Sequence, residues 1–354
     1  MRKFISLAMA ACVAVLAASC GSAASTSQTG AAAPAASGST DTGKYAIIVK
    51  NTGNPYNDRE ASGFHDACKE LGVTAIVNAP DQPTAEAQIA MIENLTAQKV
   101  GGIAIAGNDL DALQPALTKA MAAGIKVCSL DSAVNPSSRM VHVNQADTNK
   151  IGITLCDAAL DLCGPDGGEF AILSATSQAA NQNAWIAVMQ ETLKDSKYAK
   201  LKLDKIAYGD DLRDKSTSET QGLLQSFPNL KCIVAPTTVG IAAAAKVVTD
   251  KNLIGKVNVT GLGLPSEMAA YIDNKACPYM YLWNPIDVGY LASYTLNALI
   301  QGKITGAVGD KFTAGRLGDY AVTKDTNGDG GTEVLLGPPF KFDPSNIGQW
   351  KTVY

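Results

Sequence analysis

From Lys44 onward, short apolar runs rich in β-branched residues alternate with helical segments without a break. The runs predict strands at Tyr45–Val49, Val73–Asn78, Gly102–Ala106, Lys126–Leu130, Glu169–Ser174, Leu201–Tyr208, Cys232–Ala235 and Lys256–Leu262. The segments between them predict helices at Asp58–Leu71, Thr84–Lys99, Asp109–Ala123, Asn183–Lys194, Ser216–Ser226 and Ile241–Lys251. Continuously apolar strands separated by such helices are typical of right-handed βαβ units with both sheet faces covered. The sequence therefore predicts an α/β fold of two successive doubly wound parallel sheets, with about five strands in each.

The last part of the chain departs from this alternation. Pro285–Gln301 predicts another helix, and Lys311–Tyr320 and Thr332–Leu336 predict strands on either side of a Gly/Asp-rich turn. Because this segment is not a further βα repeat, we expect it to return the chain between two lobes through a hinge of several crossings. We expect residues 44–145 and about 285–312 in an N-terminal lobe, and residues 146–284 and about 313–354 in a C-terminal lobe.

The first twenty residues predict a lipoprotein signal peptide. Arg2 and Lys3 precede the apolar run Phe4–Ala18, which breaks at Ser19–Ser22. A basic start, a short apolar segment and small residues at the break are typical of a secretory leader and not of a membrane span. A cysteine at the break resembles that of bacterial lipoproteins, so we expect Cys20 to be lipidated after cleavage. The alternative is simple cleavage that leaves Cys20 unmodified.

Residues 21–43 predict a flexible tether. They are almost all Ala, Ser, Thr, Gly, Gln or Pro, which cannot bury enough apolar surface to offset the entropy of ordering. We therefore expect an exported chain that is anchored by its lipid on the extracytoplasmic face of the membrane, at the cell surface or in the periplasm. Removal of Arg2 and Lys3 takes the net charge from −4 to about −6. An acidic chain without basic runs argues against nucleic acid as a partner.

The chemistry-bearing residues favour binding over catalysis. The sequence holds two histidines and has no G-x-S-x-G, P-loop or G-x-G-x-x-G motif, so we expect no enzyme, no catalytic residue and no cofactor. No C-x-x-C or Cys/His cluster indicates a zinc site. Six cysteines beyond the leader are predicted to be small buried hydrophobic residues: Cys68, Cys128, Cys156, Cys163, Cys232 and Cys277.

The segment Asp325–Gly330 resembles the first half of a calcium loop. The twelfth position of such a loop needs a bidentate carboxylate, and here it is Leu336. We therefore predict a hairpin turn and no metal site, the alternative being a calcium site completed by a distant Glu.

Polar and aromatic residues follow several of the predicted strands. In open parallel sheets, ligands bind beyond the carboxyl ends of the strands. Charged groups and amides can bind the hydroxyls of a ligand, and aromatic faces can cover the C–H side of a sugar-like ring. The predicted ligand-binding residues are Lys50, Asn51, Tyr56, Asp131, Asn181, Gln182, Trp185, Pro236, Thr238, Trp283 and Asn284.

Each of these residues also has a simpler interpretation. Lys50 could be a solvated lysine at a strand end, and Asp131 could cap a turn. Trp185 and Trp283 could belong to an ordinary apolar core.

Six motifs in one order carry a family resemblance that spans Lys44 to the C-terminus. They are Val49–Pro55, Ala175–Trp185, Ala235–Gly240, Gly261–Met268, Leu282–Pro285 and Ala314–Tyr320. Together they resemble the periplasmic-binding-protein type 1 family, and within it the rhamnose-binding and LsrB-type autoinducer-2 receptors of ABC importers.

The resemblance leaves the ligand open. The autoinducer-2 receptors use a lysine after the first strand and an aspartate after the fourth, which correspond here to Lys50 and Asp131. They also use an Asp-Gln pair and a Pro-x-Ala loop, where this chain keeps Gln182 and Pro236 but has Asn181 and Thr238. Thr238 is compatible with a loop that offers only its backbone. Asn181 replaces a charged double acceptor with one acceptor and one donor pair, which favours a rhamnose-type site.

The resemblance thus implies a solute-binding lipoprotein that closes its two lobes over rhamnose or a similar small sugar. Its partners would be this ligand and the membrane permease of the importer, and we expect a monomer. The alternatives are an autoinducer-2 receptor for quorum-signal uptake and a receptor for another pentose or hexose.

Overall fold

The computed structural model describes residues 40–354. The predicted leader, Cys20 and nearly all of the predicted tether lie outside these residues. The predicted end of the tether at Gly43 is wrong, because strand β1 (Asp41–Ile48) already begins at Asp41. Among the described residues, no helix has the length and apolar character to span a bilayer.

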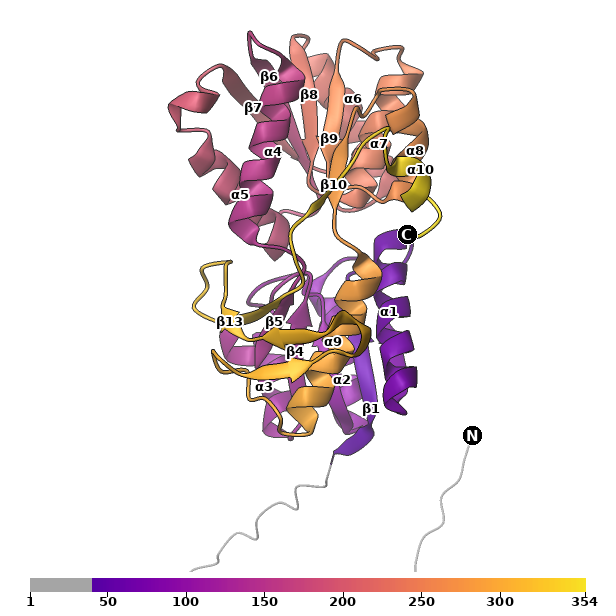
Figure 1. The fold of residues 1–354 in the computed structure, drawn as a ribbon, viewed down its shortest axis with the longest axis vertical. Helices are drawn as coiled ribbons and strands as arrows, with labels where there is room; N and C mark the ends of the chain where they lie inside the picture. Colours follow the sequence, from indigo (N-terminus) through magenta and orange to yellow (C-terminus); the bar gives the residue numbers. More distant parts are fainter. Residues whose placement is uncertain (1–39) are drawn as a thin grey trace, which may run out of the picture. The chain divides into compact units, whose positions relative to one another are not determined.

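The first lobe is built on a seven-stranded sheet with the strand order β13-β14-β5-β4-β3-β1-β2 (Figure 1). Its other strands are β2 (Thr74–Asn78), β3 (Val100–Ile105), β4 (Lys126–Leu130), β5 (Val141–Asn144), β13 (Thr323–Lys324) and β14 (Thr332–Leu335). All neighbours are parallel except β13 and β14. In β1, Tyr45 lies opposite Ala75 of β2 and Gly102 of β3.

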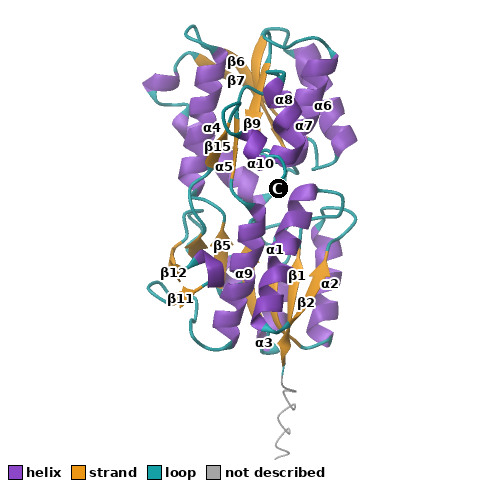
Figure 2. Ribbon diagram, turned by 45° about the vertical axis from the view of Figure 1, so that its right-hand side comes forward, coloured by secondary structure: helices purple, strands orange, loops and turns teal. Residues whose placement is uncertain are grey.

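Helices cover both faces of this sheet (Figure 2). They are α1 (Pro55–Leu71), α2 (Ala85–Ala97), α3 (Gln114–Ala122) and α9 (Pro285–Ile300). Successive side chains of a strand point to opposite faces. Tyr45 and Ile47 accordingly pack in the core that contains α1 and α9, and Ala46 and Ile48 in the core that contains α2 and α3.

Helices α1 and α9 meet backbone to backbone. A Cβ atom built on Gly63 of α1 would lie 1.8 Å from the carbonyl oxygen of Ile286, and one on Gly289 of α9 would lie 1.8 Å from that of Glu60. Only glycine fits at such distances. Both helices also begin in the same way, with an asparagine cap followed by proline.

The second lobe is built on a four-stranded parallel sheet with the order β7-β6-β8-β9. Its strands are β6 (Gly168–Ser174), β7 (Leu201–Tyr208), β8 (Leu230–Ala235) and β9 (Asn258–Gly261). Its helices are α4 (Thr148–Cys163), α5 (Ala180–Thr192), α6 (Arg213–Ser226), α7 (Thr238–Asp250), α8 (Pro265–Asp273) and the short α10 (Ile347–Trp350).

Short elements complete the two lobes. β10 (Met280–Leu282) pairs antiparallel with β15 (Phe340–Phe342), and β11 (Lys311–Thr313) pairs with β12 (Asp319–Ala321). Three single-turn 3₁₀ helices lie at Pro136–Ser138, Ser196–Tyr198 and Gly315–Leu317.

The predicted α/β class with doubly wound parallel sheets is confirmed, but five strands in each sheet is wrong. The first sheet gains β5, β14 and β13, whereas β10 joins the second lobe only through a bridge from Leu262 to Tyr281 beside β9.

The predicted placement of about 313–354 in the C-terminal lobe is also wrong for most of that segment. β14 pairs with β5, with Glu333 opposite His142, so the chain stays in the first lobe as far as Leu335. An edge strand such as β5 leaves a row of backbone groups unpaired, and β14 satisfies them. Only β15 and α10 return to the second lobe. Helix α9 packs against α1, β3 and β4 of the first lobe.

Two smaller predictions are confirmed. Asp325–Gly330 lies in the hairpin that joins β13 to β14. All six cysteines of the described chain are buried and unpaired.

Candidate ligand-binding site

The carboxyl ends of strands from both sheets converge on one pocket. It is lined by Lys50, Asn54, Tyr56, Asn57, Asp131, Asn181, Gln182, Trp185, Asp211, Pro236, Thr237, Thr238, Leu262, Leu282 and Trp283. All of the residues predicted from the sequence line it, except Asn51 and Asn284. Their contact with a ligand remains a prediction, but the structure brings them together.

Asn51 and Asn284 lie beside the pocket and act on its walls. The side-chain and backbone oxygens of Asn51 both accept hydrogen bonds from Nδ2 of Asn57, at 2.9 and 2.8 Å. Asn284 caps α9 by accepting from the Ile286 N–H at 3.0 Å. Asn51 therefore orients a residue of the lining, and Asn284 begins a helix.

A chain of hydrogen bonds runs across the centre of the pocket. Lys50 Nζ donates to Oδ1 of Asn181 at 2.9 Å, and Nδ2 of Asn181 donates to Oδ2 of Asp131 at 3.1 Å. The Tyr56 hydroxyl donates to the other oxygen of Asp131 at 3.1 Å, and Trp283 Nε1 donates to the Tyr56 hydroxyl at 2.6 Å. Lys50 and Asp131 belong to the first lobe and Asn181 to the second. One amide thus joins a cation and an anion across the two lobes.

Backbone geometry directs Asp131 into the pocket. Its φ of 55° lies in the left-handed region, which Asp and Asn adopt more readily than other residues with a side chain. The turn ends β4 at Leu130, and the Asp131 N–H donates to the carbonyl oxygen of Val143. The carboxylate therefore stands at the end of the sheet, where sequence analysis expects it.

Two tryptophans form an aromatic wall. The rings of Trp185, from α5, and Trp283, from the segment after β10, lie 5.8 Å apart between centroids at an interplanar angle of 61°. Both rings are buried. This edge-to-face pair gives the pocket an apolar surface of the kind that the C–H face of a sugar ring contacts.

Sequence analysis missed four polar residues of the lining: Asn54, Asn57, Asp211 and Thr237. Asp211 follows β7 and accepts a hydrogen bond from the Thr237 hydroxyl. The rule that selected Asp131 at a strand end would also have selected Asp211, had it been applied to β7. The sequence around Asn54 indicates a helix cap. In the structure, Oδ1 of Asn54 also accepts a hydrogen bond from the Thr238 hydroxyl of the second lobe, at 3.3 Å.

The charge of Lys50 counteracts the effect of burial on the two aspartates of the pocket. Burial raises the pKa of Asp131, while the charge of Lys50 and hydrogen bonds from Tyr56 and Asn181 act in the opposite direction. Burial likewise raises the pKa of Asp211, and Lys50 again opposes the shift. Among the described residues of the lining, Lys50 alone is cationic.

A further carboxyl group lies next to this network. Glu60 of α1 is completely buried, and neither of its carboxyl oxygens has a hydrogen-bond partner among the described residues. Burial, and then the charge of Asp131, raises the pKa of Glu60 well above its usual value. Burial and the neighbouring Asp131 charge therefore both favour the protonated form of Glu60.

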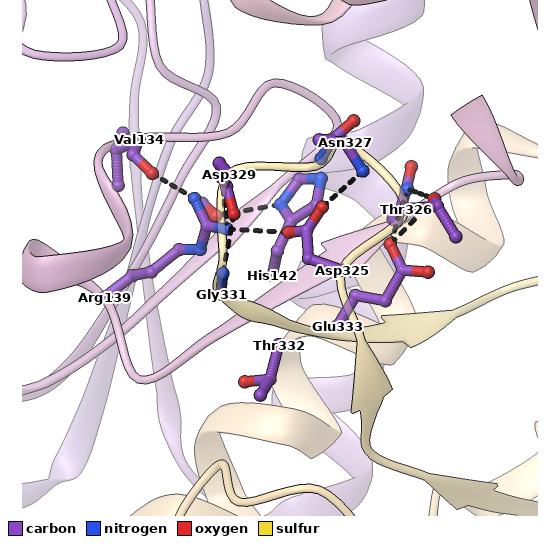
Figure 3. A network of polar contacts seen from close by, with 12 residues as sticks. Val134, Arg139, His142, Asp325, Thr326, Asn327, Asp329, Gly331, Thr332 and Glu333 are labelled. Atoms are coloured by element: carbon purple, nitrogen blue, oxygen red, sulfur yellow. Dashed lines mark hydrogen bonds and ion pairs between the residues drawn. The ribbon is translucent and has the colours of Figure 1, made fainter. Parts of the chain in front are cut away.

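The hairpin loop at Asp325–Gly330 uses its carboxylates for an ion pair. Arg139 donates to Asp325 at 2.7 Å and to Asp329 at 2.8 Å, as Figure 3 shows. Burial raises the pKa of Asp325 to about 6 against the influence of Arg139. In residues 40–354, no group of three His, Cys, Asp or Glu side chains is arranged to hold a metal ion.

The sequence of this chain is similar to those of known binding proteins. Residues 45–304 match the model of a family described as periplasmic binding protein domain. The chain is 26% identical over 254 residues to the D-allose-binding periplasmic protein of Escherichia coli (strain K12), covering 70% of this chain and 81% of that protein.

Two solved structures are also similar. An ABC transporter solute binding protein from Clostridium phytofermentas with bound L-rhamnose is 52% identical, with a TM-score of 0.86 and coverage of 89% of this chain and 100% of that one. LsrB from Clostridium saccharobutylicum in complex with AI-2 is 21% identical, with a TM-score of 0.81 and coverage of 87% and 99%. At 21% identity, the similarity to LsrB shows a shared fold and no more.

Proposed function

The chain belongs to the periplasmic binding protein domain family, as a sugar-binding solute receptor of an ABC transporter, and we propose that its ligand is rhamnose or a similar small sugar. A receptor of this kind binds its ligand and catalyses no reaction. Its place of action is extracytoplasmic, and its partner is the permease of the transporter.

The arrangement of Lys50, Asn181 and Asp131 carries the proposal. Sugar hydroxyls both donate and accept hydrogen bonds, and the pocket offers a cationic donor, carboxylate acceptors and an amide that does both. Leu262 and Leu282 add apolar surface to the lining, which suits the methyl group of a deoxyhexose. The 52% identity with a protein that has L-rhamnose bound supports the same ligand.

We propose that the ligand acts by closing the hinge. Asn181 joins the lobes through Lys50 and Asp131, and Thr238 joins them through Asn54. The space left in the pocket is about 30 Å³, room for about one or two water molecules. Exchange of a sugar therefore requires the lobes to separate, and a sugar that contacts both lobes stabilises the closed form.

Autoinducer-2 is the second candidate ligand. Lys50, Asp131 and Gln182 all line the pocket, which is the set that the autoinducer-2 receptors would share with this chain. Asn181 argues against it. Its donor group already serves Asp131, a bond that an aspartate at this position could not make.

Calorimetric titration of the purified protein with L-rhamnose, other monosaccharides and autoinducer-2 tests the proposal. We expect L-rhamnose to bind more tightly than the other ligands. Tight autoinducer-2 binding without rhamnose binding would reverse the ranking, and the absence of binding to any sugar would refute the proposed ligand class.

The variant Asp131→Asn tests the site. Asparagine retains the left-handed backbone that alanine would strain, and it removes the charge and replaces one acceptor oxygen with a donor amide. Hydrogen bonds to charged groups contribute about 1.5–3 kcal/mol, so we expect rhamnose affinity to fall by roughly 10- to 150-fold. Unchanged affinity in calorimetry would remove Asp131 from the site.

We also propose that the protein is a lipid-anchored monomer. The basic start, the apolar run and the break at Cys20 support the anchor, and all of them lie outside the described residues.

A further inference from the structure

A second and larger cavity adjoins the ligand pocket. Its volume is about 370 Å³, against about 30 Å³ for the space left in the pocket itself. Volumes of about 300–1,000 Å³ are typical of sites for small organic ligands. The second cavity is therefore large enough to hold a molecular group and not only water.

The two spaces share a wall. Asp131, Asn181 and Trp185 line both of them, and the 3.1 Å hydrogen bond from Asn181 to Asp131 belongs to this wall. These are the groups that we expect to bind a sugar. A sugar that contacts these groups therefore lies next to the second cavity.

The lining of the second cavity suits a neutral polyhydroxylated group. It offers carboxylates from Asp109 and Asp111, amides from Gln178 and Gln145, and the ring of Trp185. None of the described residues that line it is Lys, Arg or His, so an anionic substituent would find no countercharge.

Gln145 has hydrogen-bonding capacity that the protein does not use. The residue is fully buried, and both its Oε1 and its Nε2 are without a partner among the described residues. A buried amide without partners is unfavourable, so a ligand group that hydrogen-bonds to Gln145 would remove a cost that the protein alone carries.

The remaining wall is firmly held. Asn327 and Asp329 of the β13–β14 loop line the cavity, and Arg139 binds Asp329 (Figure 3). The Thr148 hydroxyl donates to Oδ1 of Asn327 at 2.6 Å, which ties the same loop to the start of α4. A wall fixed on two sides is preorganised, and preorganisation lowers the entropic cost of binding.

We propose that this cavity receives a second sugar unit, joined by a glycosidic bond to the unit in the first pocket, so that the receptor binds rhamnose-containing disaccharides as well as the free sugar. The inference rests on the proposed function, because the first unit must occupy the pocket around Asp131.

The test compares free L-rhamnose with two disaccharides that carry rhamnose at the non-reducing end, rutinose and neohesperidose. We expect the purified wild-type protein to bind at least one of them within about tenfold of free rhamnose in calorimetry. Ala184→Trp, on the α5 wall, fills the second cavity and should weaken that disaccharide by at least about tenfold while rhamnose changes less than about twofold.

A matched control is Ala187→Trp. Ala187 lies on the same helix, is exposed and does not line the second cavity, so both ligands should bind as in the wild type. Gln178→Trp is a second filling variant at an exposed position of the lining, should Ala184→Trp fail to fold.

The outcomes separate the two proposals. Binding of rhamnose with rejection of both disaccharides overturns the inference and leaves the proposed function intact. Disaccharide binding that survives both filling variants, or a filling variant that loses both ligands equally, also overturns it. If neither rhamnose nor a disaccharide binds to the wild type, the proposed function itself has failed.

Discussion

At the scale of single residues, Asn181 is the side chain that we propose discriminates between the candidate ligands. Its oxygen accepts from Lys50 while its nitrogen donates to Asp131, so the amide is used in both directions. Its orientation is further set by the N–H of Gln182, which donates to the same oxygen at 2.9 Å. The chemistry of this one side chain therefore differs from that of a carboxylate at the same place, which could accept but not donate.

Asn181→Asp should discriminate between the two candidate ligands. It places a second carboxylate beside Asp131, and a ligand oxygen that needs a donor loses one, which costs on the order of 1–3 kcal/mol. Rhamnose binding should weaken by roughly 5- to 150-fold, and autoinducer-2 binding should stay equal or become stronger. Titration of both ligands into both proteins measures the difference.

The control is Gln190→Glu, which adds the same charge at an exposed position of α5 away from the pocket. Its rhamnose affinity should match the wild type. If Asn181→Asp also leaves rhamnose affinity unchanged, position 181 does not choose the ligand.

Glu60 gives the protein a stability that depends on pH. Burial raises the pKa of Glu60 well above 4.5, the value for the free side chain. Its favourable contribution to folding is therefore fully present below pH 4.5 and is lost as the pH rises through the pKa of the folded state. Glu60→Gln cannot ionise, so it escapes this loss.

The free energy of unfolding of Glu60→Gln should thus exceed that of the wild type by an amount that grows with pH. Between pH 4.5 and the pKa of Glu60 in the folded protein, this difference in unfolding free energy should grow by about 1.4 kcal/mol for each pH unit. Denaturant titrations of both proteins between pH 4.5 and 8 measure it. A difference that stays constant across this range would show that Glu60 remains charged.

At the scale of elements, regular local patterns were predictable and long-range pairings were not. β3 (Val100–Ile105) is buried along its whole length and reads as a strand from its apolar run. β5 was missed because His142 and Asn144 interrupt its apolar pattern. Nδ1 of His142 shares a 2.8 Å hydrogen bond with the hydroxyl of Ser129 in the neighbouring strand, while its buried Nε2 has no partner among the described residues. Since β14 pairs with β5, the missed strand also led to the wrong lobe for the tail.

The candidate site was more predictable than the tail because it follows from a local rule. Lys50 and Asp131 follow apolar strands directly, so their positions at the sheet edge can be read from the sequence. Asn54 has two functions, as a cap and as the partner of Thr238, and only the first has a local signature. Asn284 has the same Asn-Pro signature, and its side chain caps α9 and donates to Asp287.

The contact between α1 and α9 should tolerate no side chain. Gly63→Ala places a Cβ 1.8 Å from the carbonyl oxygen of Ile286, so the helices must move apart, and overpacking of this kind costs about 1–3 kcal/mol or more. Gly222→Ala is the matched control, because Gly222 lies in α6 with nothing within 4 Å of the added atom.

The two variants should change stability in opposite directions. Alanine inside an exposed helix is favoured over glycine by about 0.5–1 kcal/mol, so Gly222→Ala should stabilise the protein. Thermal unfolding of the three proteins measures both shifts. An unchanged melting temperature for Gly63→Ala would contradict the close approach of the two helices.

At the scale of the whole molecule, a sugar receptor has to stay near its permease. The predicted lipid at Cys20, which lies outside the described residues, would keep it at the membrane, and the predicted tether would give it reach. Neither feature involves the pocket, so anchoring and binding should be separable.

Cys20→Ala should move the protein from the membrane fraction to the soluble envelope fraction or the medium, with rhamnose affinity unchanged. Cys12→Ala is the control, because Cys12 lies within the apolar run of the leader and is removed with it. Fractionation of cells that express each variant, followed by immunoblotting, measures the distribution. Membrane association that persists in Cys20→Ala would refute lipidation at this residue.

The interleaved chain path sets an order for folding during secretion. The second lobe is nearly one continuous segment from α4 to β10, whereas the first sheet needs β14, which pairs with β5 almost two hundred residues earlier. A chain that emerges with its N-terminus first exposes the apolar side chains of Tyr45, Ile47 and Phe64 until α9 arrives to cover them. The half of the protein that comes first in the chain is therefore the half that finishes folding later, with apolar surface exposed in the meantime.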